Sequence, residues 1–228
     1  MKGSITLYHG SKECIEHPEF GEGKVTNDYG QGFYCTEHYD LASEWASKRP
    51  DEDGYVNQYT LQMKDLKILD LTSPAYNILH WMTLLLKNRT FALSTNISIE
   101  AKEYLIKHFS VDVSGYDMIK GYRADDSYFS FAEDFLNNAI SVEHLSRAMK
   151  LGKLGIQYVL VSKKAFEALT FEKADLVANS RYYPLYQKRD EAARKKYCNS
   201  KAHLSNSKDE LYVIDIIREE IQNGDPRL

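Results

Sequence analysis

The sequence predicts an α+β fold, with a sheet of mixed or antiparallel strands that alternate irregularly with helices. The first observation is a set of short stretches in which aromatic and β-branched residues cluster, or apolar and polar residues alternate. They predict strands over 5–9, 31–36, 54–63, 66–71, 113–122 and 156–162. The second observation is the helical spacing of apolar residues in segments between these strands. With 228 residues, the chain can bury a substantial core.

Capping residues and prolines set the expected helix limits. The helix after the second strand ends before Pro50, because the residue preceding a proline avoids the helical conformation. Ser73-Pro74 is typical of a helix start, and Ser98 and Ser141 are further candidate starts. The expected helices are 38–49, 73–89, 98–109, 127–138, 141–150 and 187–198. Residues 211–217 are apolar and fit either a helix or a strand.

We expect a main domain over residues 1–172 and a C-terminal helical extension over 173–228 that packs on it, because the composition changes after Phe171. The extension contains a basic helix with interleaved tyrosines. A charge run on a helix is usually a solvated face, but such a surface can also contact nucleic acid or a partner protein. Both interpretations stay open. The basic residues are Lys188, Arg189, Arg194, Lys195 and Lys196.

Composition narrows the class of protein. The chain is 43% hydrophobic and 27% charged, as in ordinary globular proteins. A net charge of -4 argues against a broad surface that coats nucleic acid, although a local basic patch stays compatible. Three cysteines without close pairing (Cys14, Cys35 and Cys198) predict reduced thiols. Because metal-ligand spacings, long apolar runs and a signal-peptide stretch are all missing, we expect a cytoplasmic protein without metal or membrane contact.

One candidate binding element is the stretch from Asp28 to Trp45. Gly30 and Gly32 permit a sharp turn and close approach of another group. Tyr34 then leaves this turn on a strand, where its ring can present a flat face to a ligand. Trp45, on the following helix, could close over the same ligand. By itself, such a stretch is more often a strand entry with buried aromatic residues.

A second element, Leu7-Tyr8-His9-Gly10-Ser11, lies near the N-terminus. It reads as a strand that ends in a histidine followed by a permissive glycine, which alone is usually a turn. Together with Tyr29-Gly-Gln-Gly-Phe-Tyr34, however, it resembles the motifs of the ADP-ribosyltransferase superfamily. The resemblance is to the branch of the poly-ADP-ribose polymerases and diphtheria toxin. It is closest to an uncharacterised bacterial family found in toxin–antitoxin-like loci.

The resemblance covers residues 5–62 and 113–172. It implies a core of two small packed sheets around an NAD cleft, with helical insertions. It also implies a mono-ADP-ribosyltransferase, a glycosyltransferase-type enzyme that uses NAD as substrate and modifies a protein or nucleic-acid acceptor. A toxin role restrained by a small antitoxin-like protein is part of the same expectation.

The resemblance assigns roles to individual positions. His9 would bind a ribose hydroxyl of the adenosine half, and the Gly10 backbone with the Ser11 hydroxyl would hold the nicotinamide carboxamide. Tyr34 would stack on the nicotinamide ring, and Trp45 would be a second stacking aromatic residue. The expected NAD-binding set is His9, Gly10, Ser11, Gly32, Tyr34 and Trp45, and the expected catalytic set is His9, Tyr34 and Gln157.

Gln157 departs from the family pattern. It lies in the apolar strand where related enzymes carry a glutamate, which binds the ribose 2′-hydroxyl and stabilises the cationic transition state. Glutamine keeps the hydrogen bond and loses the charge, so we expect mono-ADP-ribosylation or NAD hydrolysis, and a gain in hydrolysis on Gln157→Glu. Asp125 or Asp126 could supply a compensating acid or base, although capping the next helix is their simpler interpretation.

Two other functions stay open. The chain could be a non-catalytic module that binds NAD or ADP-ribose, which the loss of charge at Gln157 favours. It could also be a protein-interaction module whose glycine motifs are structural turns. NAD affinity without turnover would identify the first of these, and absence of any nucleotide affinity would identify the second.

Overall fold

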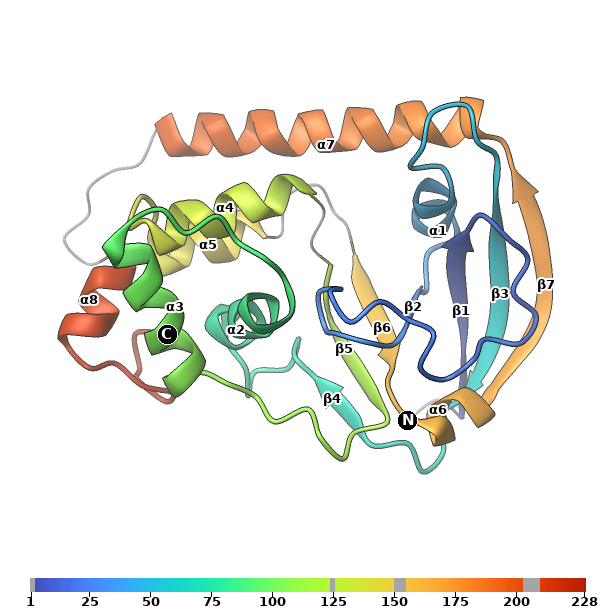
Figure 1. Cartoon of the computed structure of the whole chain (residues 1–228), viewed down its shortest axis with the longest axis horizontal. Coiled ribbons are helices and arrows are strands. Elements are labelled where there is room, and N and C mark those ends of the chain that lie inside the picture. Colours follow the sequence, from blue (N-terminus) through green and yellow to red (C-terminus); the bar gives the residue numbers. More distant parts are fainter. Residues whose placement is uncertain (1–2, 124–125, 150–154, 203–209) are drawn as a thin grey trace.

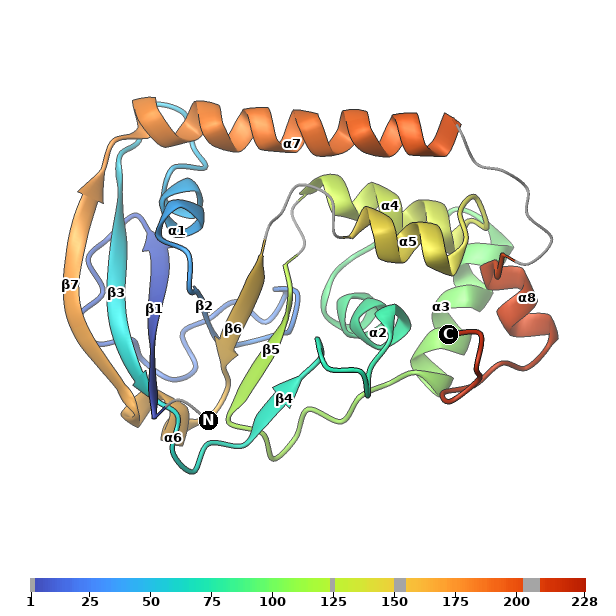
Figure 2. The same cartoon turned by 180° about the vertical axis from the view of Figure 1, so that it is seen from behind.

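The computed structural model describes residues 3–123, 126–149, 155–202 and 210–228. Within them, the chain forms one open sheet with helices beside it (Figures 1 and 2). The strands are β1 (Ser4–Ser11), β2 (Phe33–Thr36), β3 (Gly54–Gln62), β4 (Ile68–Asp70), β5 (Met118–Tyr122), β6 (Ile156–Leu160) and β7 (Leu169–Val177). The helices are α1 (Tyr39–Ala46), α2 (Ile78–Asn88), α3 (Asn96–His108), α4 (Asp126–Leu136), α5 (Val142–Ala148), α6 (Lys163–Glu167), α7 (Asn179–Ala202) and α8 (Val213–Arg218).

In the described part of the chain, the sheet has seven strands in the order β4-β5-β6-β2-β1-β3-β7. Its pairs are antiparallel except for the parallel pair β4–β5. This confirms the predicted α+β class with a mixed sheet. The expected pair of small packed sheets is wrong, because all the strands join one sheet.

The sheet is nevertheless weakly joined at its centre. β1 and β2 pair through Tyr8 and Thr36, whereas β1 pairs with β3 along its whole length, from Ser4 to Ser11. Beyond Tyr8, the end of β1 therefore diverges from β2. This divergence divides the sheet into a β4-β5-β6-β2 part and a β1-β3-β7 part, and it opens a gap between them.

Two large clusters of buried side chains, and a small third one between α1, β3, β7 and α7, stabilise these parts. The larger joins the helices α2, α3, α4, α5 and α8 to the β4–β6 part of the sheet, and its largest fully buried members include Trp81, Phe109 and Phe135. The second large cluster includes Leu7 and Tyr59 and covers the other side of the central strands. Burying each such side chain contributes roughly 1.5–3 kcal/mol.

The long helix α7 connects the two parts of the molecule (Figures 1 and 2). Near its middle, Arg189 forms an ion pair with the buried Glu44 of α1. Near its end, the Tyr197 hydroxyl donates a hydrogen bond of 2.5 Å to Asp134 of α4. The helix thus spans from the β1-β3-β7 part to the helical part, and Arg189 and Tyr197 serve intramolecular packing.

Several element limits differ from the sequence prediction. The domain boundary at residue 172 falls inside β7, so the C-terminal extension begins as an edge strand. α7 begins at Asn179 and runs through Pro184, where the sequence predicted a start at residue 187. α2 begins after Asn77, whose side chain accepts the Leu79 N–H, and not at Ser73-Pro74. Residues 213–218 form a helix, which settles the open alternative.

Two smaller findings concern the cysteines and the helices. The three cysteines are free, with Cys35 buried and Cys14 and Cys198 exposed. Among the residues that the structure describes, no helix combines the length and apolar character needed to cross a membrane.

Candidate functional site: a pocket at the divergence of β1 and β2

The three predicted catalytic residues lie on three neighbouring strands: His9 on β1, Tyr34 on β2 and Gln157 on β6. Gln157 pairs with Thr36, so its side chain shares a face of the sheet with Tyr34, two residues away. His9 belongs to the opposite face by the same alternation. Because β1 diverges from β2 after Tyr8, one pocket at the gap reaches side chains from both faces.

This pocket has a volume of about 1020 Å³, at the upper end of the range of roughly 300–1,000 Å³ for ligand sites. The loop between β1 and β2 forms one side of it, and strands β1, β2 and β6 with α1 form much of the rest. The lining is completed by Lys48, Arg89, Arg123 and Phe166. All the predicted NAD-binding and catalytic residues contribute to its lining. These are His9, Gly10, Ser11, Gly32, Tyr34, Trp45 and Gln157.

The His9 ring is fixed in the gap between β1 and β2. Its Nδ1 lies 2.7 Å from the Tyr34 carbonyl oxygen, so Nδ1 carries the proton and donates. Phe33 stacks on the ring with centroids 4.4 Å apart. Burial lowers the pKa of His9, and the bond to the Tyr34 carbonyl raises it by a smaller amount. The imidazole is therefore neutral at pH 7, with Nε2 available as an acceptor.

The lowered pKa of His9 predicts that the stability of the fold depends on pH. The unfolded chain takes up a proton at this residue near the ordinary pKa of 6.5, whereas the folded chain does so only at lower pH. The unfolded state therefore binds more protons below pH 6.5, and stability falls as the pH falls through that range. We expect a smaller loss of melting temperature from pH 7.5 to 5.5 in His9→Gln than in wild type. An identical loss in both proteins would show that His9 does not contribute.

Gly10 and Ser11 are held close to α1 and to the loop that follows β1. A Cβ atom on Gly10 would lie 1.9 Å from the Ala42 carbonyl oxygen, so only glycine allows α1 to approach β1. The Ser11 hydroxyl donates to the Glu13 carbonyl and accepts a 2.9 Å bond from Asn57. The Ser11 proton is thus already engaged, and its oxygen can only accept from a ligand.

The fully buried Asn57 organises this end of β1, although the sequence did not identify it. Its amide nitrogen donates to Ser11 and to the carbonyls of His9 and Glu13. Its amide oxygen accepts the Ile15 N–H at 2.8 Å. A polar residue within an alternating strand is the signal that could have found it, because such residues need internal partners when buried.

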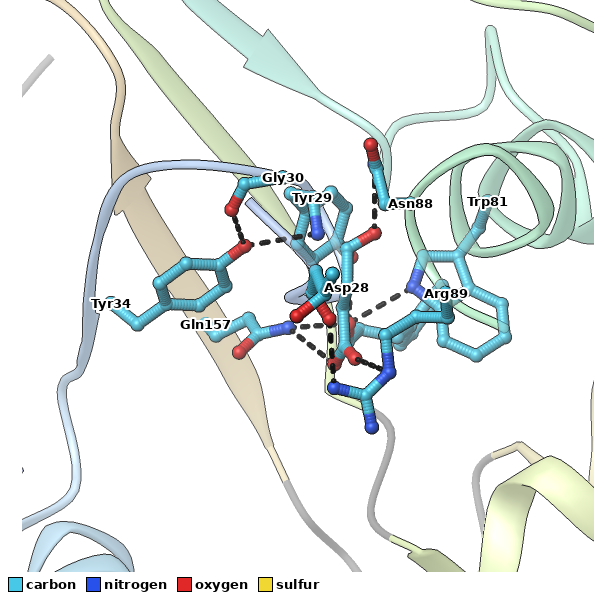
Figure 3. Close-up of polar contacts among 10 residues, drawn as sticks. Asp28, Tyr29, Gly30, Tyr34, Trp81, Asn88, Arg89 and Gln157 are labelled. Atoms are coloured by element: carbon cyan, nitrogen blue, oxygen red, sulfur yellow. Dashed lines mark hydrogen bonds and ion pairs between the residues drawn. The ribbon is translucent and has the colours of Figure 1, made fainter. Parts of the chain in front are cut away.

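Tyr34 closes the turn that precedes it. Its hydroxyl accepts the Tyr29 N–H at 3.0 Å and donates to the Gly30 carbonyl at 2.7 Å (Figure 3). Gly30 has a φ of 79°, in the left-handed region that glycine tolerates. The ring thus lines the pocket while its hydroxyl fixes the loop. Burial raises the pKa of Tyr34, which keeps this hydroxyl protonated.

Replacing Tyr34 with phenylalanine should keep an aromatic ring in the pocket but release the turn. The Tyr29 N–H loses its acceptor, so we expect a loss of about 1–3 kcal/mol in the free energy of unfolding. Urea denaturation measures this loss. Tyr183→Phe, which removes a hydroxyl bonded to Gln187 at the surface, is the control with an expected change within about 0.5 kcal/mol. Equal stability of the two variants would contradict the proposed role.

Trp45 lies at the α1 side of the pocket, and Arg123 covers one face of its ring at 4.4 Å. Its Nε1–H is buried, and no acceptor for it lies among the described residues. The structure therefore leaves Trp45 with a buried donor at the pocket, in addition to the ring face that the sequence predicted for stacking.

Gln157 is almost completely buried, and its amide nitrogen has acceptors nearby. The nitrogen lies 3.3 Å from Oδ2 of Asp28 and 3.3 Å from the Tyr122 carbonyl oxygen (Figure 3). Asp28 also lines the pocket. No role for Asp28 could be predicted from the sequence, because 129 residues separate it from Gln157 and no local pattern connects the two.

The predicted auxiliary carboxylates are not placed. Asp125 lies outside the described residues, and Asp126 opens α4 with a side chain that the structure does not describe. Among described residues, the carboxylate that accompanies Gln157 is Asp28. The described residues contain no cluster of three or more His, Cys, Asp or Glu side chains that could hold a metal ion.

The pocket lining is more basic than the chain as a whole. Its basic side chains outnumber the acidic ones, although the chain carries a net charge of -4. Arginine and lysine are the usual partners of phosphate groups in proteins. The basic residues are Lys12, Lys24, Lys48, Arg89 and Arg123, and the acidic ones are Glu19, Glu22 and Asp28.

Comparison with known proteins identifies a family but no activity. The family model described as "Protein of unknown function (DUF3990)" matches residues 5–171, which include every residue of the pocket. No curated protein matches the chain, and no solved structure matches it.

Proposed function

The chain belongs to the DUF3990 family of proteins of unknown function, and we propose that it is a mono-ADP-ribosyltransferase that consumes NAD. The observation that carries the proposal is the common pocket of His9, Tyr34 and Gln157. These residues come from three strands and from distant parts of the sequence, and the motif resemblance assigns each of them to NAD.

The proposed reaction breaks the bond between ribose C1′ and the nicotinamide nitrogen. The bonding electron pair leaves with nicotinamide, whose positive charge is neutralised, and a cationic ribose develops at C1′. A nucleophilic oxygen or nitrogen of the acceptor then bonds to C1′ and loses its proton. The site must therefore bind the nicotinamide ring, orient the ribose and favour the cation over the ground state.

The pocket offers groups for each requirement. The Tyr34 ring can stack on nicotinamide, a contact worth on the order of 1 kcal/mol beyond burial. Nε2 of the neutral His9 can accept a hydrogen bond from a ribose hydroxyl, since Nδ1 already donates to the Tyr34 carbonyl. The Gln157 amide oxygen can accept the 2′-hydroxyl, because its nitrogen is occupied.

The basic side chains of the pocket suit the diphosphate. Arg123, Lys12 and Lys48 supply positive charge to the pocket, and the buried Trp45 Nε1–H can donate to a phosphate oxygen. An uncharged Gln157 in place of a glutamate favours transfer of a single ADP-ribose unit, or hydrolysis, over polymer synthesis. The acceptor is a protein or a nucleic acid, and the toxin role with an antitoxin-like partner is part of the proposal.

The test combines binding with transfer. Purified protein is incubated with NAD labelled in its adenine half, with and without cell lysate, and its melting temperature is measured in NAD and in ADP-ribose. Protection by NAD and transfer of label to a lysate component would support the enzyme. Protection without loss of NAD would identify the non-catalytic binding module instead. Absence of both effects would overturn the NAD site altogether.

A further inference from the structure

We infer that Asp28 supplies the negative charge that stabilises the cationic ribose, while Gln157 supplies the hydrogen bond to its hydroxyl. This inference rests on the proposed NAD-consuming function. A glutamate would perform both tasks with one side chain. Here the two tasks are divided between side chains 3.3 Å apart, which lie on a loop and on β6.

Asp28 is built into the site. It is 8% exposed, and its carboxylate accepts from Gln157 and lies 3.7 Å from Nε of Arg89. Its backbone carbonyl accepts a 3.2 Å bond from the Asn88 side chain (Figure 3). A buried carboxylate is costly unless donors surround it. Gln157 of β6 and Arg89, the residue after α2, therefore stabilise the carboxylate itself, while Asn88 holds the backbone of Asp28 in place.

The next residue fixes the position of Asp28 further. The Tyr29 N–H donates to the Tyr34 hydroxyl, and the Tyr29 hydroxyl donates to the Tyr122 carbonyl at 2.6 Å. The same carbonyl accepts from Trp81 and from Gln157. Asp28 is thus coupled to the nicotinamide-stacking Tyr34 on one side and to Gln157 on the other (Figure 3). Preorganised charge of this kind lowers a barrier without reorganisation cost during the reaction.

The orientation of Gln157 agrees with this division. Its amide nitrogen faces Asp28 and the Tyr122 carbonyl, and its amide oxygen is on the side turned away from Asp28 (Figure 3). The oxygen is therefore left for a ligand hydroxyl. As the C1′–N bond breaks and its electron pair leaves with nicotinamide, the positive charge on the ribose develops beside the Asp28 carboxylate. No proton or electron moves to Asp28.

The same geometry reverses the sequence-based expectation for Gln157→Glu. A glutamate at residue 157 would place a second carboxylate against Asp28 and against the Tyr122 carbonyl, both of which are acceptors. Like charges at this separation repel strongly when buried. The substitution should therefore lower turnover, although it restores the residue type of the related enzymes.

Exchanging the two groups tests the inference. Asp28→Asn keeps the shape and can still accept from Gln157, and the double variant Asp28→Asn/Gln157→Glu moves the charge across the pair. We expect Asp28→Asn to lower the kcat of nicotinamide release about 100-fold with a small change in KM. Gln157→Glu should lower kcat about 10-fold or more. The kcat of the double variant should be at least 10-fold higher than that of Asp28→Asn.

The control is Asp117→Asn. Asp117 is 9% exposed and bonded to Ser162 and the Lys67 N–H, but it does not line the pocket. Its loss should reduce stability and leave kcat within about 3-fold. A kcat for Asp28→Asn within 3-fold of wild type, or no recovery in the double variant with all proteins folded, would overturn the role of Asp28. Absence of His9-dependent release in wild type would instead overturn the proposed function.

Discussion

Replacing His9 with alanine is expected to lower kcat/KM for nicotinamide release from NAD at least 100-fold while the chain stays folded. The variant loses the Nε2 acceptor and the 2.7 Å bond from Nδ1 to the Tyr34 carbonyl, which fixes the gap between β1 and β2. Loss of one preorganised polar group in an enzyme site commonly costs this much in rate. The loss of the Tyr34 contact adds about 1–3 kcal/mol of destabilisation.

The matched control is His38→Ala. His38 is exposed, lies outside this pocket and precedes α1 without capping it through its side chain. Turnover should be unchanged in this variant. If His9→Ala retained turnover within a few-fold of wild type, with both variants folded by circular dichroism, the assigned role of His9 would be wrong.

Replacing Gly10 with alanine should destabilise the chain by on the order of 3 kcal/mol or more. The added methyl group would lie 1.9 Å from the Ala42 carbonyl oxygen and 2.8 Å from the Ala46 nitrogen, both of which belong to the α1 backbone. Backbone atoms cannot turn aside as a flexible side chain can, so α1 must move away from β1. Because α1 carries Trp45, the pocket would be distorted as well.

Chemical denaturation measures the Gly10→Ala effect. Gly3→Ala is the matched control, since a Cβ atom at Gly3 meets nothing within 4 Å. The free energy of unfolding of this variant should be within about 0.5 kcal/mol of the wild-type value. A Gly10→Ala protein as stable as Gly3→Ala would show that β1 and α1 are not packed as described.

The strands that form the centre of the fold could be predicted because their patterns are local. β1, β2, β3 and β6 carry apolar or alternating residues between turn signals, and each lies within or near its predicted range. β7 was missed because it is an edge strand that carries Glu172, Lys173 and Asp175, so its alternation is masked by charges. Pro184 likewise concealed the true start of α7.

The candidate site could be predicted where its parts are motifs. His9-Gly10-Ser11 is one continuous segment and the Gly30–Tyr34 turn is another, so each can be found as a local motif. The structure brings both to one pocket. The partnership of Asp28 with Gln157 could not be predicted, because it depends on how β2 pairs with β6 and on the turn before β2. One sequence contains no signal that connects side chains so far apart.

The central claim, that this chain consumes NAD, is tested most directly by the amount of nicotinamide that the purified wild-type protein releases from NAD over time. We predict release of more than one nicotinamide per chain, matched by loss of NAD, in the presence of lysate. NAD that stays intact during the incubation, in a preparation shown to be folded, would contradict the claim.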